Sequence, residues 1–280
     1  MQKILFLIFG LFLFYTSTLF SQSNRSIDGS GNNIQNVDLG AAHTQLRRFT
    51  SIGYSDGISA PGGLTRPNPR IISYGLFAQD SLINDPLNLS VFVCVFGQFM
   101  DHDISLTGDS NESAFVQVPA GDPWFDPFGQ GTALIFMSRS EVMSGTGTST
   151  TNPREHANEI TTWIDASNVY GSDTSRANWL RSFVDGKMKM STQDLLPFNT
   201  FTGNYATPVN YNAPAMDDAV GNSNYHFVAG DPRANENPLL SAFHTLFVRE
   251  HNRLCNLLKV EHPTWDDEQL YQHAEKWLGA

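Results

Sequence analysis

The stretch FGQFMDHDIS, Phe96 to Ser105, closes an almost entirely apolar run with Asp101, His102 and Asp103 in succession. Charged side chains are rarely buried unless they are paired or hold a ligand. The apolar run predicts a helix that packs into a core. The three ionisable groups at its end therefore indicate either a helix terminus that faces water or a site shared with other parts of the chain.

The helix that carries this stretch is expected to run from about Pro86 to about Leu106. Asp85 precedes Pro86, and an acidic N-cap before a proline is a typical helix start. The same cap-then-proline pattern recurs at Asn237-Pro238, before apolar residues with a period of 3.6. We therefore expect a second long helix there, and a further helix that begins near Pro263 or Asp266.

Residues three and four apart lie on one face of a helix. This spacing groups Gln98, Asp101, His102 and Ser105, whereas Asp103 points about 100° away from His102. One face thus offers an amide, a carboxylate and an imidazole, and a second face offers a separate carboxylate. A solvated helix end is an equally good interpretation of the spacing alone.

A second group of polar residues lies in TTWIDASNVYGS, Thr161 to Ser172. Thr161, Trp163, Asp165 and Ser167 are spaced by two, so in an extended segment they point the same way. Hydroxyl, carbonyl and carboxylate oxygens suit calcium better than zinc or copper, and Asp103 could supply a second carboxylate. An ordinary polar strand explains the same spacing.

A third group lies in AGDPRANEN, Ala229 to Asn237, where Arg233 precedes Glu236 by three residues. An arginine in a loop that enters a helix can face an anion or a developing negative charge. The alternative is a surface ion pair of little energetic value. His244 and His251 share a face of the following helix, and we expect core or surface histidines there rather than the ligands of a zinc hydrolase.

The composition is that of a globular protein: 280 residues, 40% of them hydrophobic, with a formal net charge of -11. That charge argues against non-specific binding to nucleic acid or to anionic membranes. Residues 1–22 combine a basic start with a short apolar run and predict a secretory signal peptide, with an uncleaved membrane anchor as the alternative. Cys94 and Cys255 are expected to be buried free thiols.

The layout of the remaining chain predicts a mainly α-helical fold with long irregular loops. Glycine, asparagine, serine and proline dominate 23–80, which indicates an extended N-terminal arm, and 81–280 form the helical body. Within that body we expect loops over 107–157, a helix that begins near Ser172, and irregular backbone over 195–232. The sequence stops within a helical pattern, which suggests a partial domain.

Taken in order, the motifs GQFMDHDIS, TTWIDASNVYGSD and AGDPRANENPLLSAFHTLFVREHNRL closely resemble the haem peroxidases of the animal type. The resemblance implies a mainly α-helical haem peroxidase fold, of which this chain is the N-terminal part. By position His102 is similar to the distal histidine, which transfers the peroxide proton, and Arg233 to the distal arginine, which stabilises developing charge. Gln98 is similar to the distal glutamine, which holds water or a halide.

The resemblance also assigns the acidic residues. Asp101 and Glu236 match the carboxylates that this family joins to haem as esters, so haem b linked through both is implied. Calcium is implied at Asp103 together with the loop residues, which are Thr161, Trp163 through its carbonyl, Asp165 and Ser167. The family's proximal histidine is expected downstream of this chain.

The function implied is that of a secreted peroxidase. Hydrogen peroxide would be the oxidant, and halides, thiocyanate or phenols would be oxidised through a ferryl haem. The alternative is a secreted, calcium-stabilised binding module without catalysis, because the proximal ligand is not present in this sequence. After signal cleavage no membrane contact is expected, no nucleic acid is expected as a partner, and the sequence leaves the oligomeric state open.

Overall fold

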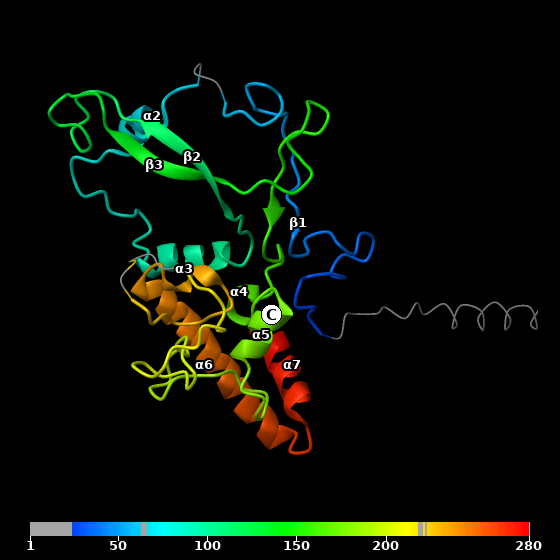
Figure 1. Ribbon diagram of the computed structural model, residues 1–280. Coiled ribbons are helices and arrows are strands. Elements are labelled where there is room, and N and C mark those ends of the chain that lie inside the picture. Colours follow the sequence, from blue (N-terminus) through cyan, green and yellow to red (C-terminus); the bar gives the residue numbers. More distant parts are fainter. Residues whose placement is uncertain (1–23, 63–65, 218–220, 222, 280) are drawn as a thin grey trace, which may run out of the picture.

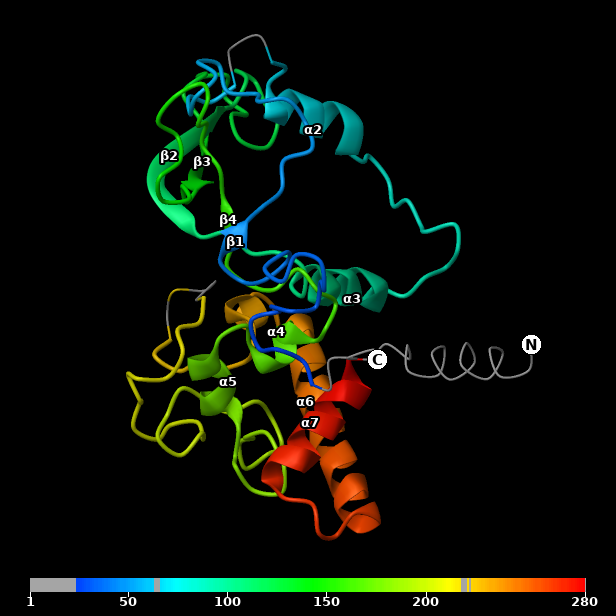
Figure 2. The ribbon, with the colours of Figure 1, turned by 90° about the vertical axis from the view of Figure 1, so that its right-hand side faces the viewer.

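The computed structural model describes residues 24–62, 66–217, 221 and 223–279. Its helices and strands lie at two levels, with α2, β2 and β3 above α3 and the remaining helices below α3 (Figures 1 and 2). The elements are β1 (Thr44–Gln45), α2 (Pro69–Phe77), α3 (Phe92–Asp101), β2 (Asp109–Gln117), β3 (Leu134–Ser140), β4 (Ala157–Asn158), α4 (Ser167–Tyr170), α5 (Thr174–Leu180), η1 (Pro232–Asn235), α6 (Pro238–Glu261) and α7 (Asp267–Leu278). The helical core confirms a mainly α fold.

Helices α6 and α7 begin where their capping residues predict. The Asn237 side chain accepts a hydrogen bond from the Leu240 N–H at 2.9 Å, and Pro238 opens α6. Asp266 and Gln269 form a reciprocal capping box at the start of α7. The two helices pack side by side (Figure 2), and α6 reaches up to α3.

The main core lies where α3, α4, α6 and α7 meet. Its fully buried members include Phe99 of α3, Tyr170 of α4 and Leu240 of α6. Phe99 also stacks on Phe247, with ring centroids 4.6 Å apart. A second, smaller cluster of Leu254, Cys255, Leu258, Leu270 and Ala274 joins α6 to α7. The C-terminal end of α3 is therefore held against a rigid body.

The start of α3 differs from the sequence expectation. Asp85 does not cap a helix at Pro86; its carboxylate accepts the Leu89 N–H at 2.7 Å and closes a local turn. Asn88 follows in the left-handed region with φ of 53°, which ends any helical path. The helix therefore begins at Phe92 and ends at Asp101, so His102 is its C-cap.

The prediction of loops over 107–157 was wrong in part, because this segment contains the antiparallel strands β2 and β3. β2 pairs with β3 at six residue pairs, interrupted by a bulge between Asp109 and Ser113. β1 pairs with β4, which ties the N-terminal segment to the chain before the Thr161 loop. The predicted arm over 23–80 also contains helix α2, capped by Asn68. The described residues between 195 and η1 are irregular, as predicted.

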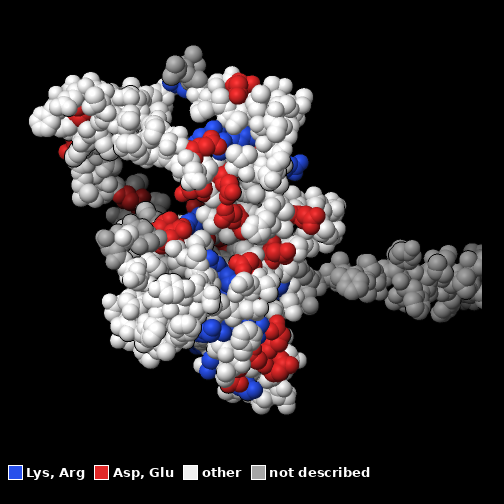
Figure 3. Space-filling model, viewed as in Figure 1, with Lys and Arg blue, Asp and Glu red and all other residues white. Residues whose placement is uncertain are grey.

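Both cysteines are free, as expected, but only Cys255 is buried; Cys94 on α3 is exposed. The expected signal peptide lies outside the described residues. Within the described residues, no helix is both long and apolar enough to cross a membrane. Figure 3 shows acidic side chains gathered down the middle of one face, with lysine and arginine among them, and this face carries no continuous basic surface.

Candidate functional site

The end of α3 meets the start of α6 through a chain of polar side chains. Gln98 donates from Nε2 to Glu236 Oε2 at 2.6 Å, and Asn237 donates from Nδ2 to Gln98 Oε1 at 2.9 Å. The Nε2 atom of His102 lies 3.9 Å from the same Glu236 oxygen. The structure thus brings Glu236 to Gln98 and His102 of α3, although it lies 138 residues after Gln98 in the sequence.

Arg233 contacts the His102 main chain, and its orientation is fixed by several acceptors. Its Nε and Nη2 donate to the two carboxylate oxygens of Asp231 at 2.9 and 2.7 Å. Nη1 donates to the Ser105 carbonyl, and Nη2 also donates to the His102 carbonyl. Four of the five guanidinium N–H groups are therefore used, which leaves one on Nη1 for a ligand.

The His102 ring is only 5% exposed, and its Nδ1 makes no hydrogen bond among the described residues. Burial lowers the pKa of this imidazole, and the positive charge of Arg233 lowers it further. The carboxylates of Asp231, Glu236 and Asp101 oppose that shift. The ring is thereby favoured in its neutral form, which can accept a proton.

Asp103 turns away from His102 into a buried polar pocket. One carboxylate oxygen accepts the main-chain N–H groups of Asp165 and Ala166 at 3.0 and 2.9 Å. The other accepts the Ser167 hydroxyl and the Asn168 N–H at 2.8 and 3.0 Å. Burial raises the pKa of Asp103, and these hydrogen bonds work against that rise.

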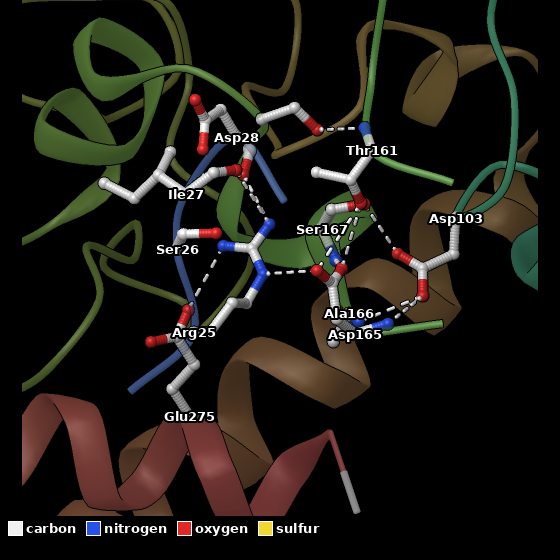
Figure 4. A network of polar contacts seen from close by, with 12 residues as sticks. Arg25, Ser26, Ile27, Asp28, Asp103, Thr161, Asp165, Ala166, Ser167 and Glu275 are labelled. Atoms are coloured by element: carbon white, nitrogen blue, oxygen red, sulfur yellow. Dashed lines mark hydrogen bonds and ion pairs between the residues drawn. The ribbon is translucent and has the colours of Figure 1, made fainter. Parts of the chain in front are cut away.

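The loop at Thr161 surrounds the same pocket (Figure 4). The Thr161 hydroxyl lies 3.3 and 3.4 Å from the two carboxylate oxygens of Asp165. Arg25 lies between Asp165 and Glu275 of α7, with Nε 3.0 Å from Asp165 and Nη1 3.3 Å from Glu275. Burial raises the pKa of Glu275 to about 7, against the lowering effect of Arg25.

Two carboxylates and two hydroxyls therefore gather where the sequence predicts calcium: Asp103, Asp165, Thr161 and Ser167. These are the hard oxygen donors that calcium prefers, but in this structure both Asp103 oxygens accept hydrogen bonds and Asp165 pairs with Arg25. Trp163 is half-buried, and its ring lies against Gly40. In the described part of the chain no group of three or more His, Cys, Asp or Glu side chains is placed to hold a metal ion, so calcium would rely on hydroxyl and carbonyl oxygens.

The predicted haem-facing residues are also placed, although they differ in burial. Gln98, His102 and Arg233 converge with Glu236, while Asp101 is the last residue of α3 and its side chain is exposed. An imidazole with an unpartnered Nδ1, an amide and a fixed guanidinium are the acid–base and charge-stabilising groups that suit the distal side of a haem. Gln98, His102 and Arg233 therefore fit the distal side of a haem.

His244 and His251 are core residues, as the sequence predicts. Both are fully buried, and burial lowers the pKa of each to about 4. His251 uses both ring nitrogens, one with the Tyr170 hydroxyl at 2.8 Å and one with the Gly186 carbonyl at 2.9 Å. The His251 ring therefore has no free nitrogen for a zinc ion.

Sequence reasoning missed several residues of the site. Asp231 had a signal, because Asp231-Pro232 repeats the cap-then-proline pattern found at Asn237-Pro238. Arg25 had none, since its partners lie as far as 250 residues along the chain. Asn168, which donates to the Phe99 carbonyl at 2.7 Å, is likewise visible only in three dimensions.

Two known proteins are similar in sequence to most of this chain. Dual oxidase 2 of Rattus norvegicus is 33% identical over 253 residues, which cover 89% of this chain and 16% of that protein. Peroxidasin of Drosophila melanogaster is 33% identical over 303 residues, which cover 95% of this chain and 19% of that protein. The chain thus spans less than a fifth of the length of these relatives.

Among solved structures, peroxidase A from Dictyostelium discoideum superposes with a TM-score of 0.75 at 29% identity, over 91% of this chain and half of that one. A fatty acid alpha-dioxygenase of Arabidopsis thaliana shares the fold, with a TM-score of 0.67 at 22% identity, over 92% of this chain and 35% of that one. The sequence profile described as animal haem peroxidase matches residues 24–280. The chain therefore belongs to the animal haem peroxidase family.

Proposed function

We propose that this chain contributes the distal side of a secreted haem peroxidase that uses hydrogen peroxide to oxidise small donors. The observation that carries the proposal is the convergence of Gln98, His102, Arg233 and Glu236 from α3, η1 and the start of α6. Membership of the family supports haem as the cofactor and peroxide as the oxidant. Halides, thiocyanate and phenols are the proposed donors.

Bound haem would supply the redox chemistry that couples the reduction of peroxide to the oxidation of the donor. The chain's own residues handle the proton and the charge. His102 takes a proton from peroxide and returns it to the leaving oxygen, which a neutral, buried imidazole can do. The remaining N–H on Arg233 Nη1 stabilises the negative charge that develops as the O–O bond breaks.

The remaining assignments concern how the cofactors are held. Asp101 and Glu236 are proposed to form ester links to haem b. Asp101 ends α3, Glu236 lies beside Gln98, and both carboxylates are exposed, which is compatible with that role. Calcium is proposed at Asp103 and the loop residues Thr161, Trp163, Asp165 and Ser167. Residues 1–22 are proposed to direct secretion.

The test is substitution His102→Ala, with the exposed His273→Ala as the matched control. We expect haem uptake, seen as a Soret band, to be kept in both variants. Peroxide-dependent oxidation of a phenol should fall about 10²–10⁴-fold in His102→Ala alone. Near-normal rates in His102→Ala would refute the assignment, and failure of the wild-type protein to take up haem would favour the calcium-stabilised binding module.

A further inference from the structure

Asp231 is the most completely buried carboxylate beside His102, and the proposed chemistry has given it no role. It is 1% exposed and precedes η1, where its side chain caps the Arg233 N–H at 2.9 Å. It also holds the Arg233 side chain through two parallel hydrogen bonds. Such a pairing fixes a guanidinium in both position and plane.

The acceptor capacity of Asp231 is not exhausted by these contacts. An ionised carboxylate offers about four acceptor positions. Arg233 fills three of them, through its main-chain N–H, Nε and Nη2. His102 Nδ1 lies 3.7 Å from Asp231 Oδ1, which already accepts the main-chain N–H and Nε of Arg233, so the open acceptor position of this carboxylate is on Oδ2. That Nδ1 atom is buried and has no hydrogen-bond partner among the described residues.

These distances decide which ring nitrogen of His102 carries the proton. A bare Nδ1 lone pair would face the lone pairs of a desolvated carboxylate, which is repulsive in a low-dielectric site. The other nitrogen, Nε2, faces Glu236 at 3.9 Å, but the Glu236 side chain is 37% exposed against 1% for Asp231, so water screens its charge more strongly. The proton is therefore favoured on Nδ1.

We propose that Asp231 is the positioning residue of this site. It holds the His102 proton on Nδ1, so that the bare Nε2 faces the side where Gln98 and Glu236 lie. Through its paired hydrogen bonds it also aims the one unused N–H of Arg233. The two atoms are 3.7 Å apart in this structure, and catalytic hydrogen bonds are often long before the substrate binds.

The proposal rests on the proposed peroxidase function only for its catalytic consequence; the tautomer of His102 can be read without activity. Long-range ¹H–¹⁵N NMR on histidine-labelled protein distinguishes a protonated Nδ1 from a protonated Nε2. The His102 signals are identified by their loss in His102→Gln. We expect Nδ1–H in the wild-type protein, and Nε2–H there would overturn the proposal without any variant of Asp231.

The variant Asp231→Asn adds the causal step, with Asp217→Asn as its control. Asp217 is an exposed carboxylate whose main-chain N–H donates to the Pro232 carbonyl, so it lies near η1 without touching His102. Asp231→Asn should shift His102 toward the Nε2–H tautomer and slow the reaction with peroxide about 10²-fold, with the apparent donor constant unchanged. Asp217→Asn should change neither.

The possible outcomes separate the two proposals. An unchanged His102 tautomer in Asp231→Asn would overturn the role of Asp231 while leaving the peroxidase function intact. A wild-type rate in His102→Ala would refute the peroxidase function, whatever the tautomer. If Asp231→Asn does not fold, the wild-type spectrum still decides which nitrogen carries the proton.

Discussion

His251 makes the stability of the fold depend on pH, and a single substitution tests this. Its ring is fully buried, and the Tyr170 hydroxyl donates to Nδ1 while Nε2–H donates to the Gly186 carbonyl. A second proton would have to sit on Nδ1, which would reverse this hydrogen bond and leave the buried Tyr170 O–H without its acceptor. Burial lowers the pKa of His251 from 6.5 to about 4, although the Gly186 contact opposes that shift.

Acid destabilises the folded state because the unfolded chain binds the His251 proton more tightly than the folded chain does. The folded-state pKa is depressed, so between pH 6.5 and 4 the unfolded chain binds a proton that the folded chain does not. The contribution of His251 to stability is therefore complete above pH 6.5 and is lost as the pH falls toward 4. Between about pH 7.5 and pH 5 this loss amounts to ~2 kcal/mol in the free energy of unfolding.

The assay is urea unfolding of the wild-type protein and of His251→Gln at both pH values. Glutamine does not titrate, so the variant should lose ~2 kcal/mol less than the wild type on acidification, whatever its stability at pH 7.5. His273→Gln, at an exposed histidine, should follow the wild type. An equal acid loss in wild type and His251→Gln would refute the reasoning.

Three further substitutions test the polar pocket around Asp103, the N-cap of α6 and the packing of Gly186 against α7. Asp103→Ala removes a carboxylate that accepts four hydrogen bonds, so it should lower the free energy of unfolding by ~3 kcal/mol or more. Chelation of calcium should lower the Tm of the wild-type protein by about 5–10 °C and should leave the Tm of Asp103→Ala unchanged. Asn237→Ala should cost ~1 kcal/mol in urea unfolding through loss of the α6 cap, whereas Asn237→Asp should cost little. Gly186→Ala should lower the urea midpoint strongly, because φ is 73° and the new Cβ would lie 2.6 Å from the Tyr271 nitrogen; a wild-type midpoint would contradict the packing.

The sequence predicts the helical half of this fold well and the remainder poorly, for a physical reason. Helices α6 and α7 carry their own start signals, Asn237-Pro238 and Asp266, so local chemistry is enough to place them. Asp85-Pro86 carries the same signal, yet the left-handed Asn88 ends the turn there and α3 begins later. Local signals identify candidate helix starts, and the tertiary structure selects among them.

The strands were missed because their stability comes from pairing across a long connection. β2 and β3 are mostly exposed along one face, so their apolar residues show no clear alternation. The same limit applies to the site. Gln98, His102 and Arg233 were predicted by resemblance, whereas Asn168 and Arg25 act through contacts that no spacing encodes.

Arg25 places a constraint on the order of events during synthesis. Its side chain is 8% exposed and makes its contacts with Asp165, the Gly171 carbonyl and Glu275. The first of these partners leaves the ribosome well over a hundred residues after Arg25, and the last 250 residues after it. At about 5–20 residues per second, Arg25 waits roughly 10–50 s for Glu275 to be translated. During that interval Arg25 can already bind Asp165 and the Gly171 carbonyl once they have been made, whereas its ion pair with α7 forms last.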